Sequence, residues 1–270
     1  MATYQKRRAC VLVKAYPQRS QKYEETVCVA AVTEDHRLLR LYPVRFRHFE
    51  ESKRFVRFDW LELDLTRPSD DSRPESYRMK EDSLRIVKRR TRMTPEECAE
   101  LWKPCVSSSL AALEGKQRAD GTSLGIIRPD PESVRFRFNP IDKLNPEEQE
   151  EIQQVYQEQQ SLLEEPLQKL PARDYMFRYE FTSAGRQHSM QIHDWEVQAT
   201  YEQYQRRYGS REKALEMMGD YYERRAPKMN LHLIMGTMHK RPWQFIIIGV
   251  LRTTADLEQV DAQSDLFSRG

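Results

Sequence analysis

The first third of the chain consists of short apolar or alternating runs separated by polar turns, and this pattern limits the fold more than any other feature. Runs of this length and composition are typical of β-strands. They cover residues 9–13, 26–32, 37–42, 56–65 and 83–88. Five or more short strands with little helix between them predict a small β-barrel or a curled sheet.

Two helix-start signals follow the predicted strands. Thr94-Pro95-Glu96-Glu97 combines an N-cap, a proline at the first helical position and an acidic first turn, so we expect a helix to about Leu113. Asn145-Pro146 opens a second, polar and Gln-rich helix to about Leu163. Short strands are predicted between these helices at 123–127 and 133–138.

The remaining sequence predicts strands at 175–181 and 187–192, a long helix at 195–225 broken near Gly209, and a final hairpin from strands 231–235 and 245–251. The expected class is α+β: an N-terminal small β-barrel or curled sheet, then helices and a second small α/β unit ending in a hairpin. We divide the chain into a β-rich basic domain (1–92), a helical connecting region with two short strands (93–170), an α+β unit (171–254) and a disordered tail (255–270).

Charge and cysteine content restrict the function classes. Forty-four basic residues nearly balance 42 acidic ones, but the stretch up to Arg92 is rich in Arg and Lys, which permits a basic face. The four cysteines form no CxxC pair and no zinc-type spacing, so a reducing cytoplasm is the expected compartment. The chain shows no signal peptide and no apolar run long enough to span a membrane, and we expect no membrane partner.

Two strand ends combine a cation with an aromatic ring. In Lys14-Ala15-Tyr16 and in Arg40-Leu41-Tyr42 the cation precedes the ring by two residues, which places both on one strand face. This pairing suits phosphate contact with base stacking, although a charged barrel rim has the same pattern. The predicted nucleic-acid-binding residues are Lys14, Tyr16, Arg19, Lys22, Tyr23, Arg40, Tyr42, Arg45, Arg47, Lys240 and Arg241.

Imidazoles and carboxylates gather at one predicted strand-to-helix junction. His188, Asp194 and Glu196 are candidate catalytic residues, and such a group can bind a divalent metal or act as base and acid. No cofactor is predicted, except Mg²⁺ if the protein is a nuclease. The alternative is structural, with Asp194 as a helix N-cap, Glu196 complementing the helix dipole and His188 in the core.

The tail carries a peptide that resembles the one by which bacterial DNA-processing proteins bind the sliding clamp of the replicase. Gln263 provides the polar contact in this pattern, and Leu266 and Phe267 provide the apolar pair. A disordered strand with these groups can order on binding. The resemblance implies the bacterial sliding clamp as a partner.

Several other segments resemble a group of prokaryotic proteins with no assigned activity. These segments are 14–28, 40–43, 71–77, 123–127, 188–196 and 236–249. The resemblance implies a shared fold and transfers no catalytic residues. We therefore expect a DNA-associated protein that binds DNA or RNA and is tethered to the clamp, acting in replication, repair or defence. The alternatives are a metal-dependent nuclease or other phosphodiester enzyme, and a protein-binding adaptor.

Overall fold

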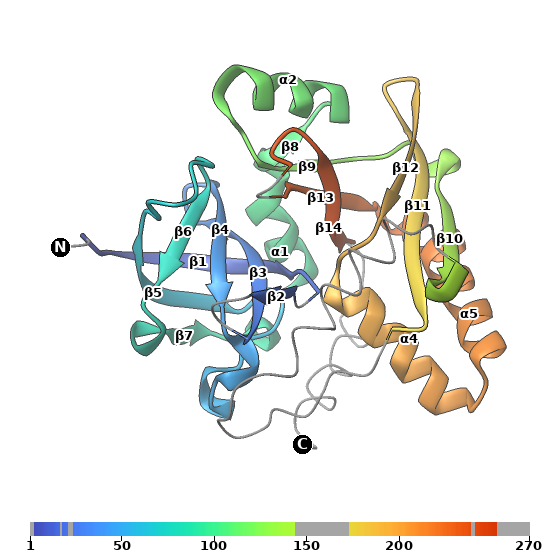
Figure 1. The fold of residues 1–270 in the computed structure, drawn as a ribbon, viewed down its shortest axis with the longest axis horizontal. Helices are drawn as coiled ribbons and strands as arrows, with labels where there is room; N and C mark the ends of the chain where they lie inside the picture. The colour runs from blue at the N-terminus through green and yellow to red at the C-terminus, as the bar shows by residue number, and fades with distance from the viewer. Residues whose placement is uncertain (1–2, 17, 21–23, 144–172, 239–240, 253–270) are drawn as a thin grey trace.

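The computed structural model describes residues 3–16, 18–20, 24–143, 173–238 and 241–252 (Figure 1). The expected helix at 145–163 and the residues Lys22, Tyr23, Lys240, Gln263, Leu266 and Phe267 lie outside these ranges. None of the helices within them is long and apolar enough to cross a membrane.

An N-terminal barrel occupies the left of Figure 1. Its strands are β1 (Gln5–Lys14), β3 (Glu24–Thr33), β4 (Leu38–Val44), β5 (Trp60–Thr66) and β6 (Ser76–Met79), with β2 (Gln18–Ser20) and β7 (Arg85–Lys88) paired outside the ring. They close in the order β1, β3, β4, β6, β5 and back to β1. The closed five-strand ring confirms the expected small barrel.

The connection of the barrel strands is that of a Greek key. The first three strands follow one another, and β5 then returns by a long connection to pair with β1. The last strand, β6, closes the ring by pairing parallel to β4 and antiparallel to β5. A five-stranded Greek-key barrel of this kind resembles the OB-fold, which binds oligonucleotides and oligosaccharides in many proteins.

The second half of the chain forms two further sheets. Strands β8 (Val106–Ser107), β9 (Leu124–Ile127), β13 (His232–Thr237) and β14 (Phe245–Leu251) make the four-stranded sheet in the order β14, β13, β9, β8. Strands β10 (Arg135–Pro140), β11 (Tyr175–Ser183) and β12 (Arg186–Gln191) make the three-stranded one. The four-stranded sheet joins β8 and β9, from the expected connecting region, to β13 and β14 of the expected C-terminal unit.

The helices agree in part with the expected ones. Thr94 caps α1 (Pro95–Trp102) as predicted, and it forms reciprocal hydrogen bonds with Glu97. The helix expected to continue to Leu113 instead stops, because Pro104 cannot continue it, and α2 (Leu110–Asp120) begins after β8. In the C-terminal half, α4 (Trp195–Tyr208) ends at Gly209 in a left-handed conformation and α5 (Arg211–Gly219) follows, which confirms the predicted break.

The outer face of the barrel packs against the four-stranded sheet. Alternate residues of β3 lie inside the barrel, such as Val29, whereas Ala30 and Val32 lie outside it in a second cluster with Trp102 of α1 and Ile248 of β14. β3 is therefore buried on both faces, which accounts for its continuous apolar sequence. In OB-folds the second and third strands bind ligands on this outer face, and here those strands are β3 and β4. In this chain the four-stranded sheet covers that outer face.

The contact between the barrel and the sheet is close at Gly249. A Cβ atom at this position would lie 2.9 Å from Cβ and Cγ2 of Val13 and 3.0 Å from Cδ1 of Ile234.

We expect Gly249→Ala to lower the free energy of unfolding by about 1–3 kcal/mol, because one of the packed strands must shift. Gly115→Ala is the control: nothing lies within 4 Å of a Cβ there. Its position within α2 predicts a gain of up to about 1 kcal/mol. Urea denaturation of both variants measures the difference, and equal stability would contradict the close contact.

Candidate functional site

The end of β1 crosses from the barrel into the C-terminal unit. Beyond Lys14 the chain forms a bridge between Ala15 and Asp194, and the amide of Tyr16 donates to the carbonyl of His193 at 2.6 Å. The amide of His193 in turn donates to Ile247 of β14 at 2.7 Å. This backbone path brings charged residues from distant parts of the sequence into one junction.

Arg57 is the central cation of the junction. Its Nη2 lies 2.9 Å from Oδ2 of Asp194 and 2.9 Å from Oε2 of Glu196, and its Nη1 donates to the carbonyl of Val250 at 2.7 Å. The side chains of Arg57 and Asp194 are 4% and 1% exposed, and that of Glu196 is 8% exposed. One guanidinium therefore pairs with two carboxylates and holds β14 beside them.

The two carboxylates have different surroundings. Asp194 accepts hydrogen bonds from the amides of Glu196 and Val250, each at 2.8 Å, in addition to its ion pair with Arg57. The Oε1 atom of Glu196 is buried and has no hydrogen-bond partner among the residues that the structure describes. Burial raises the pKa of Glu196; Arg57 counters this effect and the charge of Asp194 adds to it. Glu196 therefore takes up a proton more readily than an exposed glutamate.

A buried lysine completes the junction. Lys14 is 2% exposed, and its Nζ donates to the carbonyl of Phe55 at 3.1 Å. The same atom lies 4.1 Å from the ring centroid of Phe46 and 5.6 Å from that of Trp195. Burial lowers the pKa of Lys14 to about 8, and Glu196 partly opposes this shift.

The structure brings together two of the three predicted catalytic residues. Asp194 and Glu196 share Arg57, and Asp194 caps α4 as the structural alternative predicts. His188 lies on β12, where its ring stacks on Phe181 at a centroid distance of 5.3 Å. Burial and the nearby Arg186 lower the pKa of His188. In the described ranges, no three His, Cys, Asp or Glu residues are grouped so that they could hold a metal ion.

Several predicted nucleic-acid-binding residues are not on the surface. Arg40 is 1% exposed and donates through Nη2 to the carbonyl of Ser123 at 2.8 Å, and Tyr16 is 5% exposed. Lys14, Tyr16 and Arg40 were predicted to contact nucleic acid, but their side chains are buried and make internal contacts, such as that of Lys14 with Phe55.

The other predicted residues of this set occupy varied positions. Arg45 is exposed and pairs with Glu81 at 2.6 Å. Tyr42 and Arg47 are half-buried, and Arg19 lies in β2. Arg241 is exposed in the turn between β13 and β14, where its carbonyl accepts a hydrogen bond from the amide of Gln244 at 3.0 Å.

Two residues, Arg57 and Trp243, were not predicted from the sequence. Arg57 pairs with Asp194 across 137 positions, and no local pattern indicates that contact. Trp243 is 68% exposed in the same turn as Arg241, and it is the most exposed large hydrophobic side chain in the described part of the chain. A tryptophan directly after a basic run and a proline was the available signal for it.

Two family models match the chain. Residues 5–103 match a domain of unknown function (DUF8758), and residues 106–269, more than half of the chain, match a second domain of unknown function (DUF8757). The chain belongs to the DUF8757 family. No functionally curated protein matches it. These matches confirm the resemblance to a group without an assigned activity. The point between the DUF8758 and DUF8757 matches falls just after α1.

The two buried ion pairs of Arg57 predict a large loss of stability when this residue is replaced. We expect Arg57→Met to lower the free energy of unfolding by about 3–5 kcal/mol, because Asp194 and Glu196 then lose their direct ion-pair partner in a buried site. Arg8→Met is the matched control, since Arg8 and Glu34 form an exposed pair that contributes less than about 1 kcal/mol. Chemical denaturation of both variants measures the two values. A loss for Arg57→Met no larger than that of the control would show that the junction does not depend on this ion pair.

Proposed function

We propose that the protein binds single-stranded nucleic acid through the turn between β13 and β14, and that its C-terminal peptide tethers it to the sliding clamp. The observation that carries the proposal is the exposure of Trp243 beside Arg241. An aromatic ring that projects from a turn can stack on an unpaired base, and a neighbouring arginine can contact phosphate. Such stacking stabilises binding by about 1–3 kcal/mol per base.

The base of this hairpin contacts the loop between β5 and β6 of the barrel. Nη1 of Arg73 in that loop donates to the carbonyl of Thr237 at 2.7 Å. Asp71 holds Arg73 in place with two hydrogen bonds, one to Nε at 2.8 Å and one to Nη2 at 2.6 Å. The loop between the fourth and fifth strands is one of the ligand-binding loops of OB-folds. The contact between Arg73 and Thr237 therefore supports a shared interface of loop and hairpin.

The same barrel loop carries a cation over an aromatic ring. The guanidinium carbon of exposed Arg67 lies 4.2 Å from the ring centroid of Tyr77. Cationic and aromatic side chains together are what a strand-binding surface requires. The OB-like topology is support by analogy only, because one fold serves many functions.

The proposed cellular role is based on the C-terminal peptide. Gln263, Leu266 and Phe267 support clamp binding by their spacing alone. A tether raises the local concentration of a weak binder on DNA, so the hairpin interface needs only modest affinity. The proposed setting is replication, repair or defence against foreign DNA.

Replacement of the exposed tryptophan tests the hairpin. We expect Trp243→Ala to weaken binding of a single-stranded oligonucleotide at least about fivefold, because one stacking contact is lost. Trp243→Phe should retain most of the affinity, and Tyr4→Ala, which removes another exposed ring on the first residues of the chain, should have no effect. Fluorescence anisotropy at several salt concentrations measures the affinity and the number of phosphate contacts. Equal affinity of Trp243→Ala and the wild type would exclude this interface, and binding to proteins without any nucleic-acid affinity would favour the adaptor.

The tail is tested separately. We expect the Leu266→Ala/Phe267→Ala variant to lose binding to a bacterial sliding clamp, because the apolar pair is removed from the peptide. Ser264→Ala changes a variable position and should bind as the wild type does. Titration by surface plasmon resonance compares the three proteins. If the wild type does not bind the clamp, the tethering part of the proposal is wrong and the hairpin part stands by itself.

A further inference from the structure

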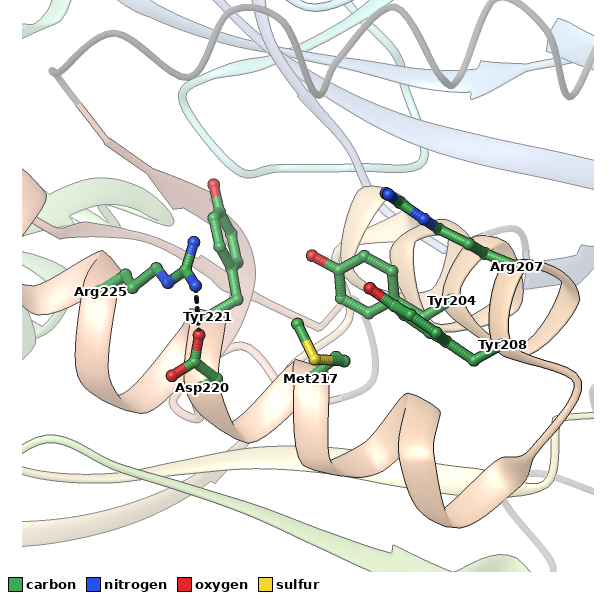
Figure 2. Close-up of a pocket in the computed structure, with 7 residues that line it drawn as sticks. All are labelled: Tyr204, Arg207, Tyr208, Met217, Asp220, Tyr221 and Arg225. Atoms are coloured by element: carbon green, nitrogen blue, oxygen red, sulfur yellow. Dashed lines mark ion pairs between the residues drawn. The ribbon is translucent and has the colours of Figure 1, made fainter.

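A pocket of about 200 Å³ lies between α4 and the helical segment that follows α5 (Figure 2). It is separate from the charged junction and from the hairpin, since none of its residues belongs to either. The residues that line it are Tyr204, Arg207, Tyr208, Met217, Asp220, Tyr221 and Arg225. Its volume is below the range of about 300–1,000 Å³ that is usual for larger ligands, which suits one small planar group.

A π-helix shapes one wall of the pocket. After α5 the chain forms the π-helix η9 (Asp220–Arg225) and then the 3₁₀-helix η10 (Ala226–Met229). Residues five apart in an α-helix point roughly 140° away from each other. The wider π turn instead brings them together, and Nη2 of Arg225 lies 2.7 Å from Oδ2 of Asp220. Short π segments within helices are frequent at functional sites.

Aromatic and sulfur-containing side chains form the rest of the wall. Tyr204 and Tyr208 lie one turn apart on α4, with ring centroids 6.0 Å apart. Figure 2 shows these rings on one side of the pocket, with Met217 between them and Tyr221. Tyr208 is 36% exposed, whereas Tyr204 is buried, so Tyr208 is the more accessible of the two rings to an incoming group. Tyrosine rings and a thioether favour a planar aromatic ligand.

The two arginines of the pocket differ in the ion pairs that they form. Arg225 pairs with Asp220, which also pairs with Arg224. Arg207 is exposed and forms no ion pair with any residue of the described ranges, and its guanidinium carbon lies 5.6 Å from the ring centroid of Tyr208. The pocket therefore combines a stacking surface with one arginine that can bind an anion. A guanidinium binds phosphate oxygens in a bidentate manner.

We propose that this pocket binds the base of one nucleotide against Tyr208, while the phosphate of that nucleotide lies outside on the exposed Arg207. The nucleotide can be a free nucleoside 5′-monophosphate or the phosphorylated end of a strand, because both present the same chemistry. The site goes beyond the hairpin interface: it lies on other elements, and occupancy does not require Trp243.

The test uses the full-length protein and isothermal titration with 5′-AMP, 5′-UMP and a 5′-phosphorylated pentanucleotide. We expect saturable binding of at least one of these probes and much weaker binding of adenosine, which lacks the phosphate. Arg207→Ala should weaken the binding at least about tenfold, since a charge-assisted contact is lost. Tyr208→Ala should weaken it at least about fivefold. Arg206→Ala, an exposed neighbour outside the pocket, should leave it unchanged, and circular dichroism checks the fold of each variant.

The probes separate the two sources of the ligand. Binding of the monophosphates indicates a free nucleotide, and binding of the pentanucleotide alone, with the same dependence on Arg207 and Tyr208, indicates a strand end. The proposal is overturned if no probe binds, or if Arg207→Ala and Tyr208→Ala bind every probe as tightly as Arg206→Ala does. Trp243→Ala should keep its monophosphate affinity, so failure of the hairpin proposal leaves this result intact.

Discussion

The guanidinium of Arg57 is the contact on which the arrangement of the two halves depends. It joins Asp194 and Glu196 at the start of α4 to the carbonyl of Val250 in β14, at a place with almost no exposure to solvent. Arginine suits this position because it offers several donors in a fixed plane and stays charged when buried. A buried ion pair is weak evidence of net stability. The loss of one partner is costly, however, because it leaves a buried charge without its ion pair.

The closure of this junction changes what the barrel can do. The outer face of β3 and β4, which binds ligands in OB-folds, packs here against the chain's own four-stranded sheet. Cations and rings at those strand ends become internal contacts, as Arg40 with Ser123 illustrates. The groups that we propose for external ligands lie on other elements: the turn that carries Trp243, and the tyrosine and arginine pocket on α4 and η9. The proposals therefore rest on side chains at these places and take only limited support from the fold.

The candidate site was predictable from the sequence where it depends on neighbours along the chain. Asp194 as the cap of α4 follows from its place before the helix and is confirmed. The burial of Lys14 and Arg40 was not predictable, because Lys14 contacts Phe55 and Arg40 contacts Ser123, 41 and 83 positions along the chain. The short strand β6 was missed for a similar reason: Ser76 to Met79 has little strand character of its own, and it forms by closing the barrel between β4 and β5.

By itself, the sequence determined the elements whose signals are local: the strands with period-two or fully apolar patterns, the cap at Thr94, the break at Gly209 and the final hairpin. Tertiary structure alone decided the closure of the barrel, the pairing of β9 with β13 and the charges that share Arg57. The physical reason is sequence separation. Caps and alternation act within a few residues, whereas Arg57 and Asp194 meet across 137 positions, where only the packing of whole elements determines which groups come together.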